Sequence, residues 1–439
     1  MSDAPDQSVT FDLPGPEYEE DTWLHNEHGS ASAAPLARTV GSGRSTPDDG
    51  HELPTRIFVN SFAYSRSEDW PPTSTLPSHL EGVDLPEDDS NLQNWRERCL
   101  PLLNEVVAEF DAFDPETVRA GEWRETIDRL QARSGEAMGL VHSSAVFEAQ
   151  MFSETFTARY VTEFGPARQA EGLALLQGFP NVSTDRAATL WGLGRIALGS
   201  PEVMSALNSG VLPSGGSDPE IEFRAEFDAA MDTYGHMNPL MMEDMPTWRE
   251  DVSVPLAIVR QFATENEERS PRVVEQATTA RRIELEAELR ETAKSSEVAV
   301  DLLTLLPYAQ HVGAVTEDHN LLADQKVYNA SRTRWLKIGE MLRDRGAVEQ
   351  AVDVYQYEYD ELIELLESDK RLSADEVALR REQLTRWRRT IPPAVLGKGA
   401  LVEVKAIAGV VVSGMAAAAG TDTGRARIIT VVTEAESLE

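Results

Sequence analysis

Residues 296–344 read SEVAVDLLTLLPYAQHVGAVTEDHNLLADQKVYNASRTRWLKIGEMLRD. The stretch predicts two helices, at about 296–313 and 317–344, which are separated only weakly. Earlier in the chain, apolar residues recur at three- and four-residue spacing from about residue 93, and a second long helical run covers about 116–163. We therefore predict a mainly α protein.

Capping signals mark the beginnings of further helices. Asp114, Ser183 and Ser200 each stand where a side-chain oxygen can accept from the free N–H groups of a first helical turn. Ser373 and Glu376 form a capping-box pattern that opens a last helix, which ends near residue 389. The other predicted helices are at about 220–232, 255–267 and 271–295, a helical or mixed segment is at 347–368, and loops are at 208–219 and 233–248.

Two parts of the chain show β-type patterns instead. In residues 56–65, RIFVNSFAYS, apolar side chains alternate between the two sides of an extended chain. This pattern predicts one short strand or half of a hairpin. Residues 406–414 and 424–432 are short apolar runs, and two strands alone do not form a stable domain. We therefore predict an extended or disordered acidic tail at 1–50, a multi-helix domain with a short N-terminal β element at 51–395, and a truncated C-terminal β segment at 396–439.

The composition is strongly acidic. Asp and Glu number 75 against 40 Lys and Arg, which gives a net charge of −35, and only six of the basic residues are Lys. A surface so poor in Lys is typical of proteins from extreme halophiles, with an acidic mesophilic protein as the alternative. A charge of this size repels nucleic acid and anionic lipid at ordinary ionic strength, so neither is expected as a partner.

The sequence also bears on the cellular location. It contains one cysteine, Cys99, which excludes an internal disulfide. The N-terminus is polar and acidic and lacks the apolar core of a signal peptide. The most apolar stretch, 404–419, contains Lys405 and is too short to span a bilayer. We therefore predict a cytoplasmic protein that does not enter a membrane.

Familiar catalytic and phosphate-binding motifs are absent from the sequence. It contains no Gly-x-x-x-x-Gly-Lys-Ser/Thr, no Gly-x-Gly-x-x-Gly and no Gly-x-Ser-x-Gly. Asp318 and His319, together with Asp324, place polar groups near one face of a predicted helix, but a metal site needs more ligands than these. A capping aspartate and a histidine at a helix interface are therefore the preferred interpretation.

Several segments follow one another in an informative order. They are Ile57-Phe-Val-Asn-Ser-Phe-Ala-Tyr, Leu176-Gln-Gly-Phe-Pro-Asn with Leu190-Trp-Gly-Leu, Tyr234-Gly-His-Met-Asn-Pro with Pro246-Thr-Trp-Arg-Glu-Asp, Glu317-Asp-His with Asp324 and Arg332, and Arg386-Trp-Arg-Arg-Thr-Ile-Pro-Pro. In this order they resemble the central region of the phosphoenolpyruvate-utilising phosphotransferases, a family that includes phosphoenolpyruvate synthase and pyruvate phosphate dikinase. The resemblance is greatest to the rifampicin phosphotransferase-like branch.

This resemblance implies a protein that works with other domains. In the family an ATP-grasp domain precedes this region, and a swivelling phosphohistidine domain with a Thr-x-x-x-Gly-Gly-x-x-Ser-His-Ala signature follows it. The last strands here look like the opening of that swivelling domain, but the signature is absent and no histidine lies beyond His319. Phosphoryl transfer needs a donor cradle, a metal with its carboxylates and a positioned acceptor, and this sequence offers only the third.

The resemblance therefore implies a non-autonomous subunit or split fragment that binds the phosphoryl acceptor and docks a phosphohistidine domain from another chain. Separate chains would carry the ATP-grasp and phosphohistidine domains, and the assembled enzyme would use ATP and Mg²⁺, with no cofactor bound by this chain alone. The alternatives are a non-catalytic helical binding or scaffold protein and a truncated reading frame.

The segment Tyr234-Gly-His-Met-Asn-Pro is the main candidate for acceptor binding. A loop between helices can line a pocket, and Tyr234, His236 and Asn238 offer hydrogen-bonding side chains. His236 could bind an acceptor oxygen or shuttle its proton, or it could instead cap a neighbouring helix in a structural turn. Four nearby methionines could form an adaptable apolar wall, with core packing as the preferred alternative: Met237, Met241, Met242 and Met245.

Four further residues are candidates on predicted helices. Asp318 and His319 belong to the family-like Glu317-Asp-His segment. Arg332 and Arg334 could attract a phosphate group, although pairing with nearby acidic residues on the surface is the preferred alternative.

Overall fold

The computed structural model describes residues 9–26, 33–40, 56–66, 90–238 and 240–398. Helices dominate these residues and the strands form one small sheet, which confirms the predicted mainly α fold. The helices are α1 (Pro35–Thr39), α2 (Ser90–Asn94), α3 (Leu100–Ala112), α4 (Trp123–Val141), α5 (Phe147–Phe164), α6 (Gln169–Ala174), α7 (Val182–Leu198), α8 (Pro201–Asn208), α9 (Asp218–Tyr234), α10 (Ser253–Thr264), α11 (Pro271–Thr292), α12 (Glu297–His319), α13 (Lys326–Asp344), α14 (Tyr359–Ser368) and α15 (Ala374–Trp387). The strands are β1 (Thr22–His25), β2 (Arg56–Val59), β3 (Phe62–Arg66) and β4 (Val395–Gly397).

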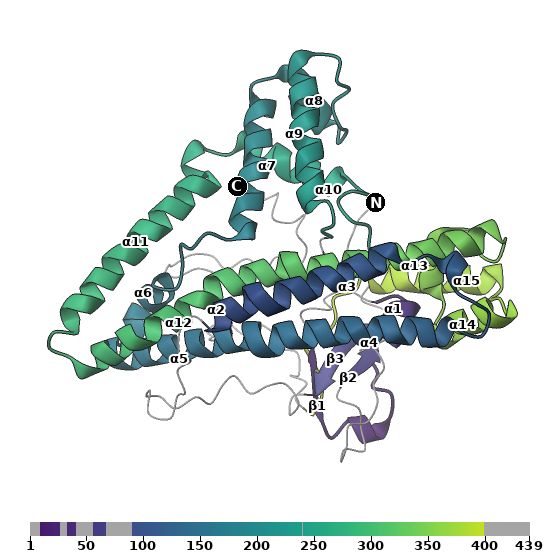
Figure 1. Ribbon diagram of the computed structural model, residues 1–439, viewed down its shortest axis with the longest axis horizontal. Helices are drawn as coiled ribbons and strands as arrows, with labels where there is room; N and C mark the ends of the chain where they lie inside the picture. The colour runs from purple at the N-terminus through teal and green to yellow at the C-terminus, as the bar shows by residue number, and fades with distance from the viewer. Residues whose placement is uncertain (1–8, 27–32, 41–55, 67–89, 239, 399–439) are drawn as a thin grey trace, which may run out of the picture.

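Three long helical rods lie side by side along the long axis of the molecule (Figure 1). Each rod contains a π-helical turn: η4 (Trp95–Cys99) joins α2 to α3, η6 (His142–Val146) joins α4 to α5, and η9 (Asn320–Gln325) joins α12 to α13. Buried apolar side chains from the rods, including Val106, Phe110 and Val315, form the shared core.

The third rod corrects one sequence prediction. Residues 297–344 form one unbroken helix, so the predicted division near residue 315 is wrong. A glycine inside a helix, such as Gly313, costs only about 1 kcal/mol relative to Ala. The packing of α12 along α5 outweighs this cost, and the helix continues through η9.

A second group of helices stands above the rods. Helices α7, α8, α9 and α10 form a bundle around an apolar core that includes Leu193, Phe227 and Val259, and α11 runs diagonally from this bundle back to the start of α12 (Figure 1). Ser200 caps α8 as predicted, because its Oγ accepts from the Val203 N–H at 3.3 Å. The bundle and the rods enclose the pockets described below.

Four antiparallel strands form a sheet of order β2-β3-β1-β4 on the opposite side of the rods (Figure 1). Residues 56–65 contain both strands of a hairpin, rather than the single strand or half hairpin that their alternation predicts. Asn60 and Ser61 both have positive φ, 48° and 62°, so they turn the chain between β2 and β3. A two-residue turn of this kind matches the natural twist of paired strands.

The sheet also changes the predicted division of the chain. β1 lies between β3 and β4, and the Trp23 side chain within it is fully buried, so the predicted 1–50 tail contributes an ordered strand. β4 ends at Gly397 and pairs with β1, so the predicted boundary at 396 falls inside this sheet. The predicted C-terminal β segment from residue 399 onward lies outside the described residues.

One helix in the described part of the chain, 297–344, is long and apolar enough to cross a membrane by length and composition alone. It packs against α5 and α3, and it buries Asp324, Arg332 and Arg334 in contacts with other elements. A core helix of a soluble protein passes the same test of composition, so this one helix is weak evidence for a membrane span. The cytoplasmic location stays a prediction.

Candidate functional site

The segment from Tyr234 to Asn238 leads from α9 into a loop that reaches α10. The Asn238 side chain is buried and holds this loop together: its Oδ1 accepts from the N–H groups of Leu240 and Met242 at 3.2 and 3.0 Å, and its Nδ2 donates to the Met242 carbonyl at 3.2 Å. The Asn238 N–H donates to Oε1 of Gln325 at 3.0 Å, and the Asn238 carbonyl accepts from Nε2 of Gln325 at 3.2 Å. Asn238 therefore attaches the loop to η9.

The other two residues of this segment make structural contacts. His236 Nε2 donates to the Leu321 carbonyl of η9 at 3.2 Å, and burial lowers the pKa of the His236 imidazole. Tyr234 is buried in the apolar core of the α7–α10 bundle. The structure thus brings Tyr234, His236 and Asn238 together near η9. His236 contacts a carbonyl inside the continuous helix 297–344, so it makes a structural contact without capping a helix end.

Arg332 and Arg334 are buried, so the surface position predicted for them is wrong. Arg332 forms a two-point contact with the Glu250 carboxylate, with distances of 2.8 Å from Nε and 2.9 Å from Nη2, and its Nη1 donates to the Glu243 carbonyl at 3.0 Å. Arg334 is fully buried between the rings of Phe110 and Trp335. Both guanidinium groups face into the protein because α13 packs beneath the loop that follows α9.

Asp318 caps the neighbouring helix α7, as the preferred interpretation stated. Its Oδ1 accepts from the Val182 N–H at 3.0 Å, and burial raises the pKa of its carboxyl group. The side chain that caps α7 from within the same segment is Asn181, whose Oδ1 accepts from the Thr184 N–H at 2.9 Å, rather than the predicted Ser183. His319 follows Asp318 but is buried on another side of the helix, near His142 and Asp324.

A pocket of about 390 Å³ lies between α7, α10, the loop after α9 and η9. Its lining residues are mostly apolar, with a few polar groups among them: Arg186, Ala187, Leu190, Met237, Asn238, Met241, Trp248, Val254, Ile258, Phe262, Asn320 and Gln325. We call it the Arg186 pocket. Its volume and its mixed lining are those of small-molecule sites. Met237 and Met241 form part of the wall, whereas Met242 and Met245 are not among its lining residues. Asn238 is the one predicted site residue that lines the pocket.

Arg186 is the charged residue of this pocket. Its Nη1 contacts Sδ of Met237 at 3.1 Å, and its guanidinium lies 6.0 Å from the centre of the Trp248 ring. Within the described part of the chain no carboxylate lies in ion-pair distance of Arg186. Burial lowers the pKa of Arg186. The Glu317 carboxylate, which lies beyond ion-pair distance, partly opposes this lowering. A half-buried cation without a paired anion is costly, and a bound anionic group would offset that cost.

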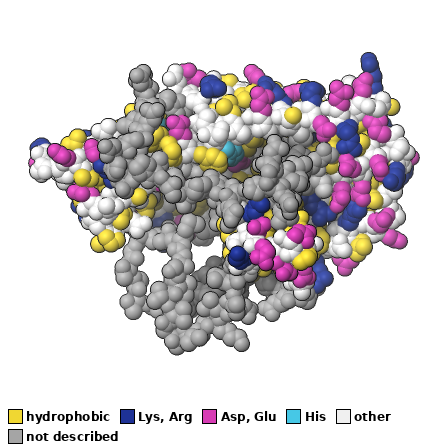
Figure 2. Space-filling model, turned by 90° about the horizontal axis from the view of Figure 1, so that it is seen from below, with side chains coloured by type: hydrophobic (Ala, Val, Ile, Leu, Met, Phe, Trp, Pro, Cys, Tyr) yellow, Lys and Arg dark blue, Asp and Glu magenta, His cyan; other side chains and the backbone are white. Residues whose placement is uncertain are grey.

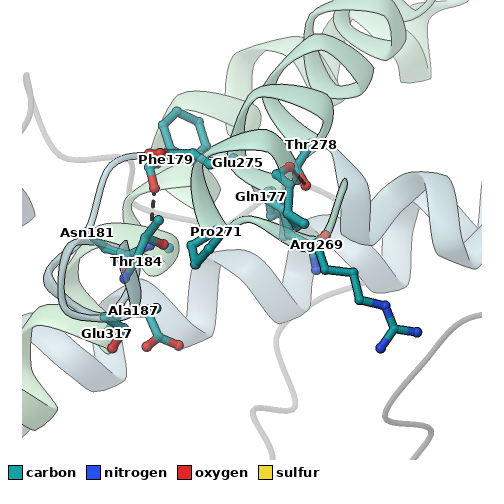
Figure 3. Close-up of a pocket in the computed structure, with 15 residues that line it drawn as sticks. Gln177, Phe179, Asn181, Thr184, Ala187, Arg269, Pro271, Glu275, Thr278 and Glu317 are labelled. Atoms are coloured by element: carbon teal, nitrogen blue, oxygen red, sulfur yellow. Dashed lines mark hydrogen bonds between the residues drawn. The ribbon is translucent and has the colours of Figure 1, made fainter. Parts of the chain in front are cut away.

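A larger pocket of about 580 Å³ lies on the other side of Ala187, which lines both (Figure 3). Phe179, Asn181 and Thr184 form one wall and Glu275 and Thr278 of α11 approach them, whereas the Arg269 side chain points away (Figure 3). Asn181 already caps α7, and Arg269 contacts Glu265 at 3.4 Å. Asn181 and Arg269 of this pocket are therefore already bound to neighbouring groups, whereas Arg186 has no ion-pair partner among the described residues.

The sequence did not identify Arg186 as a site residue. Arg186 follows Asp185 in the first turn of α7, and an arginine there usually extends into solvent. The available signal was weak: the Leu190-Trp-Gly-Leu segment of the family resemblance lies one turn farther along the same helix. Only the approach of α10 and Trp248 encloses the side chain, and that approach is a tertiary contact.

Comparisons with known proteins agree with the resemblance seen in the sequence. Residues 142–315 match the family model described as the rifampicin phosphotransferase fourth domain, a stretch that runs from η6 into α12 and includes α7 and α10. The chain is also similar to the chondramide synthase of Chondromyces crocatus, with 26% identity over 369 residues that cover 77% of this chain and 9% of that protein. The aligned part of this chain thus spans less than a tenth of that relative's length.

Proposed function

We propose that this chain binds the small molecule that accepts the phosphoryl group in a phosphotransfer reaction. The proposal is supported by the match of residues 142–315 to the family model of the rifampicin phosphotransferase fourth domain. The Arg186 pocket is the proposed binding site. The observation that carries the proposal is the Arg186 guanidinium, which lies in a largely apolar pocket without an ion-pair partner among the described residues.

The lining of the pocket defines the kind of acceptor. Leu190, Ile258 and Phe262 fit an apolar or aromatic body, and Met237 and Met241 can adapt to its shape. A guanidinium group binds carboxylate or phosphate oxygens through two parallel hydrogen bonds. We therefore propose an acceptor that combines an apolar body with an anionic group near Arg186 and a hydroxyl group that is phosphorylated.

The donor part of the reaction is proposed to lie in other domains. The family implies ATP and Mg²⁺, but the described residues do not fit them. The one group of three or more His, Cys, Asp and Glu side chains close enough to share an ion, among the residues described, contains two imidazoles, whereas Mg²⁺ prefers oxygen ligands. We propose that an ATP-grasp domain and a phosphohistidine domain act together with this chain, and that the phosphohistidine domain docks on it.

The pocket is tested first by binding. The purified chain is screened by thermal shift against hydroxyl compounds that carry a carboxylate on an aromatic or branched apolar body, and the best binder is measured by calorimetry. Arg186→Gln should weaken that binding at least ~10-fold, because a hydrogen bond to a charged group contributes about 1.5–3 kcal/mol. Arg260→Gln removes an exposed arginine of α10 outside the pocket and should leave the affinity unchanged.

The phosphotransfer role needs a second experiment. The native protein is purified from its source, any associated chain with the Ser-His-Ala signature is identified by mass spectrometry, and the mixture is assayed with labelled ATP and the bound compound. Transfer of label to the compound, lost in Arg186→Gln, is the expected result. Arg186-dependent binding without any transfer would contradict the phosphotransfer role and support the non-catalytic binding protein. Equal binding by the wild-type protein and Arg186→Gln would exclude the pocket itself.

A further inference from the structure

Three side chains with metal-binding atoms meet beneath the Arg186 pocket. His142 begins η6, His319 ends α12, and Asp324 lies within η9. His142 Nε2 is 3.8 Å from Oδ1 of Asp324, and His319 Nε2 is 3.7 Å from Oδ2 of Asp324. All three ligand atoms lie within 4.8 Å of one another, and the two imidazole rings stand at 87° to each other.

The π-helical turn η9 is what places His319 and Asp324 together. Side chains five residues apart in a regular α-helix point about 140° away from each other, because each residue turns the helix by about 100°. A π-helical turn closes hydrogen bonds between residues five apart and so brings such positions onto one face. His142 approaches from a second π-helical turn, η6, in the neighbouring rod. Such turns are frequent at functional sites.

A backbone contact orients the His142 imidazole as a ligand. Nδ1 of His142 lies 2.8 Å from the Met138 carbonyl, so this nitrogen carries the proton and Nε2 presents a lone pair toward Asp324. Histidine ligands of metals commonly have their second nitrogen fixed in this way.

We propose that His142, His319 and Asp324 bind one divalent transition-metal ion, of the class of Zn²⁺. Two imidazole nitrogens and one carboxylate suit such an ion and not Mg²⁺ or Ca²⁺. Bonds of 2.0–2.2 Å in a tetrahedral site place ligand atoms ~3.4 Å apart, so the two His–Asp distances need to shorten by only a few tenths of an ångström.

The site is reachable from the surface and connected to the pocket. The His142 side chain is 30% exposed, whereas those of His319 and Asp324 are each 8% exposed, so an ion can enter past His142 and keep one position for water. Asn320 and Gln325, on either side of Asp324 in η9, both line the Arg186 pocket. The ion therefore fixes the turn that forms one wall of the pocket. This proposal does not depend on the phosphotransfer role.

The test is metal binding by the untagged, full-length chain. After treatment with EDTA and dialysis, the protein is titrated with Zn²⁺ by calorimetry and with Co²⁺ by visible absorption. The expected result is one ion per chain, a Co²⁺ spectrum of nitrogen and oxygen ligands in low coordination, and an increase in Tm with Zn²⁺. His142→Gln and Asp324→Asn should each weaken Zn²⁺ binding by ~100-fold or more, since losing even a second-shell partner costs 10–100-fold.

The controls separate this site from weak surface binding. His311→Gln changes a histidine two turns earlier on α12 and should leave both the affinity and the stoichiometry unchanged. His142 is the most exposed of the three ligands, so His142→Gln is expected to fold, which circular dichroism verifies. Absence of stoichiometric binding by the wild-type chain, or equal Zn²⁺ affinity in folded His142→Gln, would overturn the proposal.

Discussion

Arg334 shows how a single buried charge holds the pocket-forming loop in place. Its guanidinium is enclosed by Phe110 and Trp335. It attracts the carboxylate of Glu243, whose Oε2 accepts from Trp335 Nε1 at 3.0 Å. Glu243 belongs to the loop between α9 and α10, which also carries Asn238. Through Glu243, Arg334 of the third rod holds the loop that forms one wall of the Arg186 pocket. We therefore interpret Arg334 as a residue that positions this wall.

Replacement of Arg334 by Met should destabilise the protein by about 3–5 kcal/mol, because it leaves a buried carboxylate without its opposing charge. Burial raises the pKa of Glu243, and Arg334 opposes that rise. Without Arg334 the pKa rises further, and a group with a raised folded-state pKa loses stability as the pH rises through that value. The destabilisation should therefore be greater at pH 8 than at pH 5, as measured by urea unfolding followed by tryptophan fluorescence.

Two variants make this prediction specific. Arg343→Met changes an exposed arginine of the same helix and should alter the free energy of unfolding by no more than ~0.5 kcal/mol. Adding Glu243→Gln to Arg334→Met removes the unpaired carboxylate and should recover part of the loss. A pH-independent destabilisation that the second change does not reduce would show that lost packing, rather than charge, is the cause.

At the scale of elements, the N-terminus of α7 is supported by two side chains from different places in the sequence. Asn181 accepts from the Thr184 N–H, and Asp318 of α12 accepts from the Val182 N–H. Because Asp318 stands next to His319 and η9, this cap connects the helix that carries Arg186 to the rod that carries the proposed metal site. Local sequence could indicate the first cap, but only the packing of α12 against α7 supplies the second.

The hydrogen bond from the Val182 N–H to Asp318 stabilises the fold, whereas burial of the ionised Asp318 carboxylate destabilises it. Its pKa is raised by burial, so the carboxyl group contributes stability below the usual Asp pKa and loses it as the pH rises through the higher folded-state value. Asp318→Asn keeps an oxygen acceptor without the charge. It should be more stable than the wild-type protein at pH 7, and this difference should shrink between about pH 7 and pH 4. Thermal unfolding across that range measures it.

Asp318→Ala is the comparison that separates hydrogen bond from charge. It removes the acceptor and should cost about 1 kcal/mol at the pH where Asp318 is protonated. If Asp318→Asn were as unstable as Asp318→Ala at pH 7, the carboxylate charge would be favourable at the helix N-terminus and the burial argument would fail.

The elements differ in how far sequence could predict them. Ser200 and Ser373 mark real helix beginnings, because a capping side chain acts on its own helix. The hairpin turn at Asn60 and Ser61 was missed because Ser seldom adopts positive φ. The π-helical turn η9 was also missed, since its extra residue changes no hydrophobic pattern strongly. His142 and Arg186 could not be assigned to a site for a different reason. The residues that surround them come from rods and helices distant in the sequence.

At the scale of the whole molecule, the charge excess is the dominant feature. Acidic and basic side chains are mixed over the end that carries α13, α14 and α15 (Figure 2), and exposed pairs such as Lys370 with Glu364, at 2.5 Å, form there. Exposed pairs of this kind contribute at most about 1 kcal/mol each. They cannot neutralise a net charge of −35, so most of the excess acidic charge remains and repels itself in the folded state.

This balance predicts the response to salt. Screening at 1 M ionic strength shortens the Debye length to about 3 Å, compared with about 10 Å at 0.1 M. Salt weakens the short-range ion pairs less than it weakens the repulsion among the many acidic groups that lie farther apart. The Tm should therefore rise continuously as KCl increases over this range, and calorimetry at several salt concentrations measures it. The contact between the buried Arg332 and the partly exposed Glu250 forms two hydrogen bonds at short range and is screened less than the long-range repulsion. Arg332→Met should therefore lower the Tm by a similar amount at every concentration. A Tm that stays constant or falls with KCl would show that ion pairing outweighs repulsion, and would favour the acidic mesophilic alternative over adaptation to high salt.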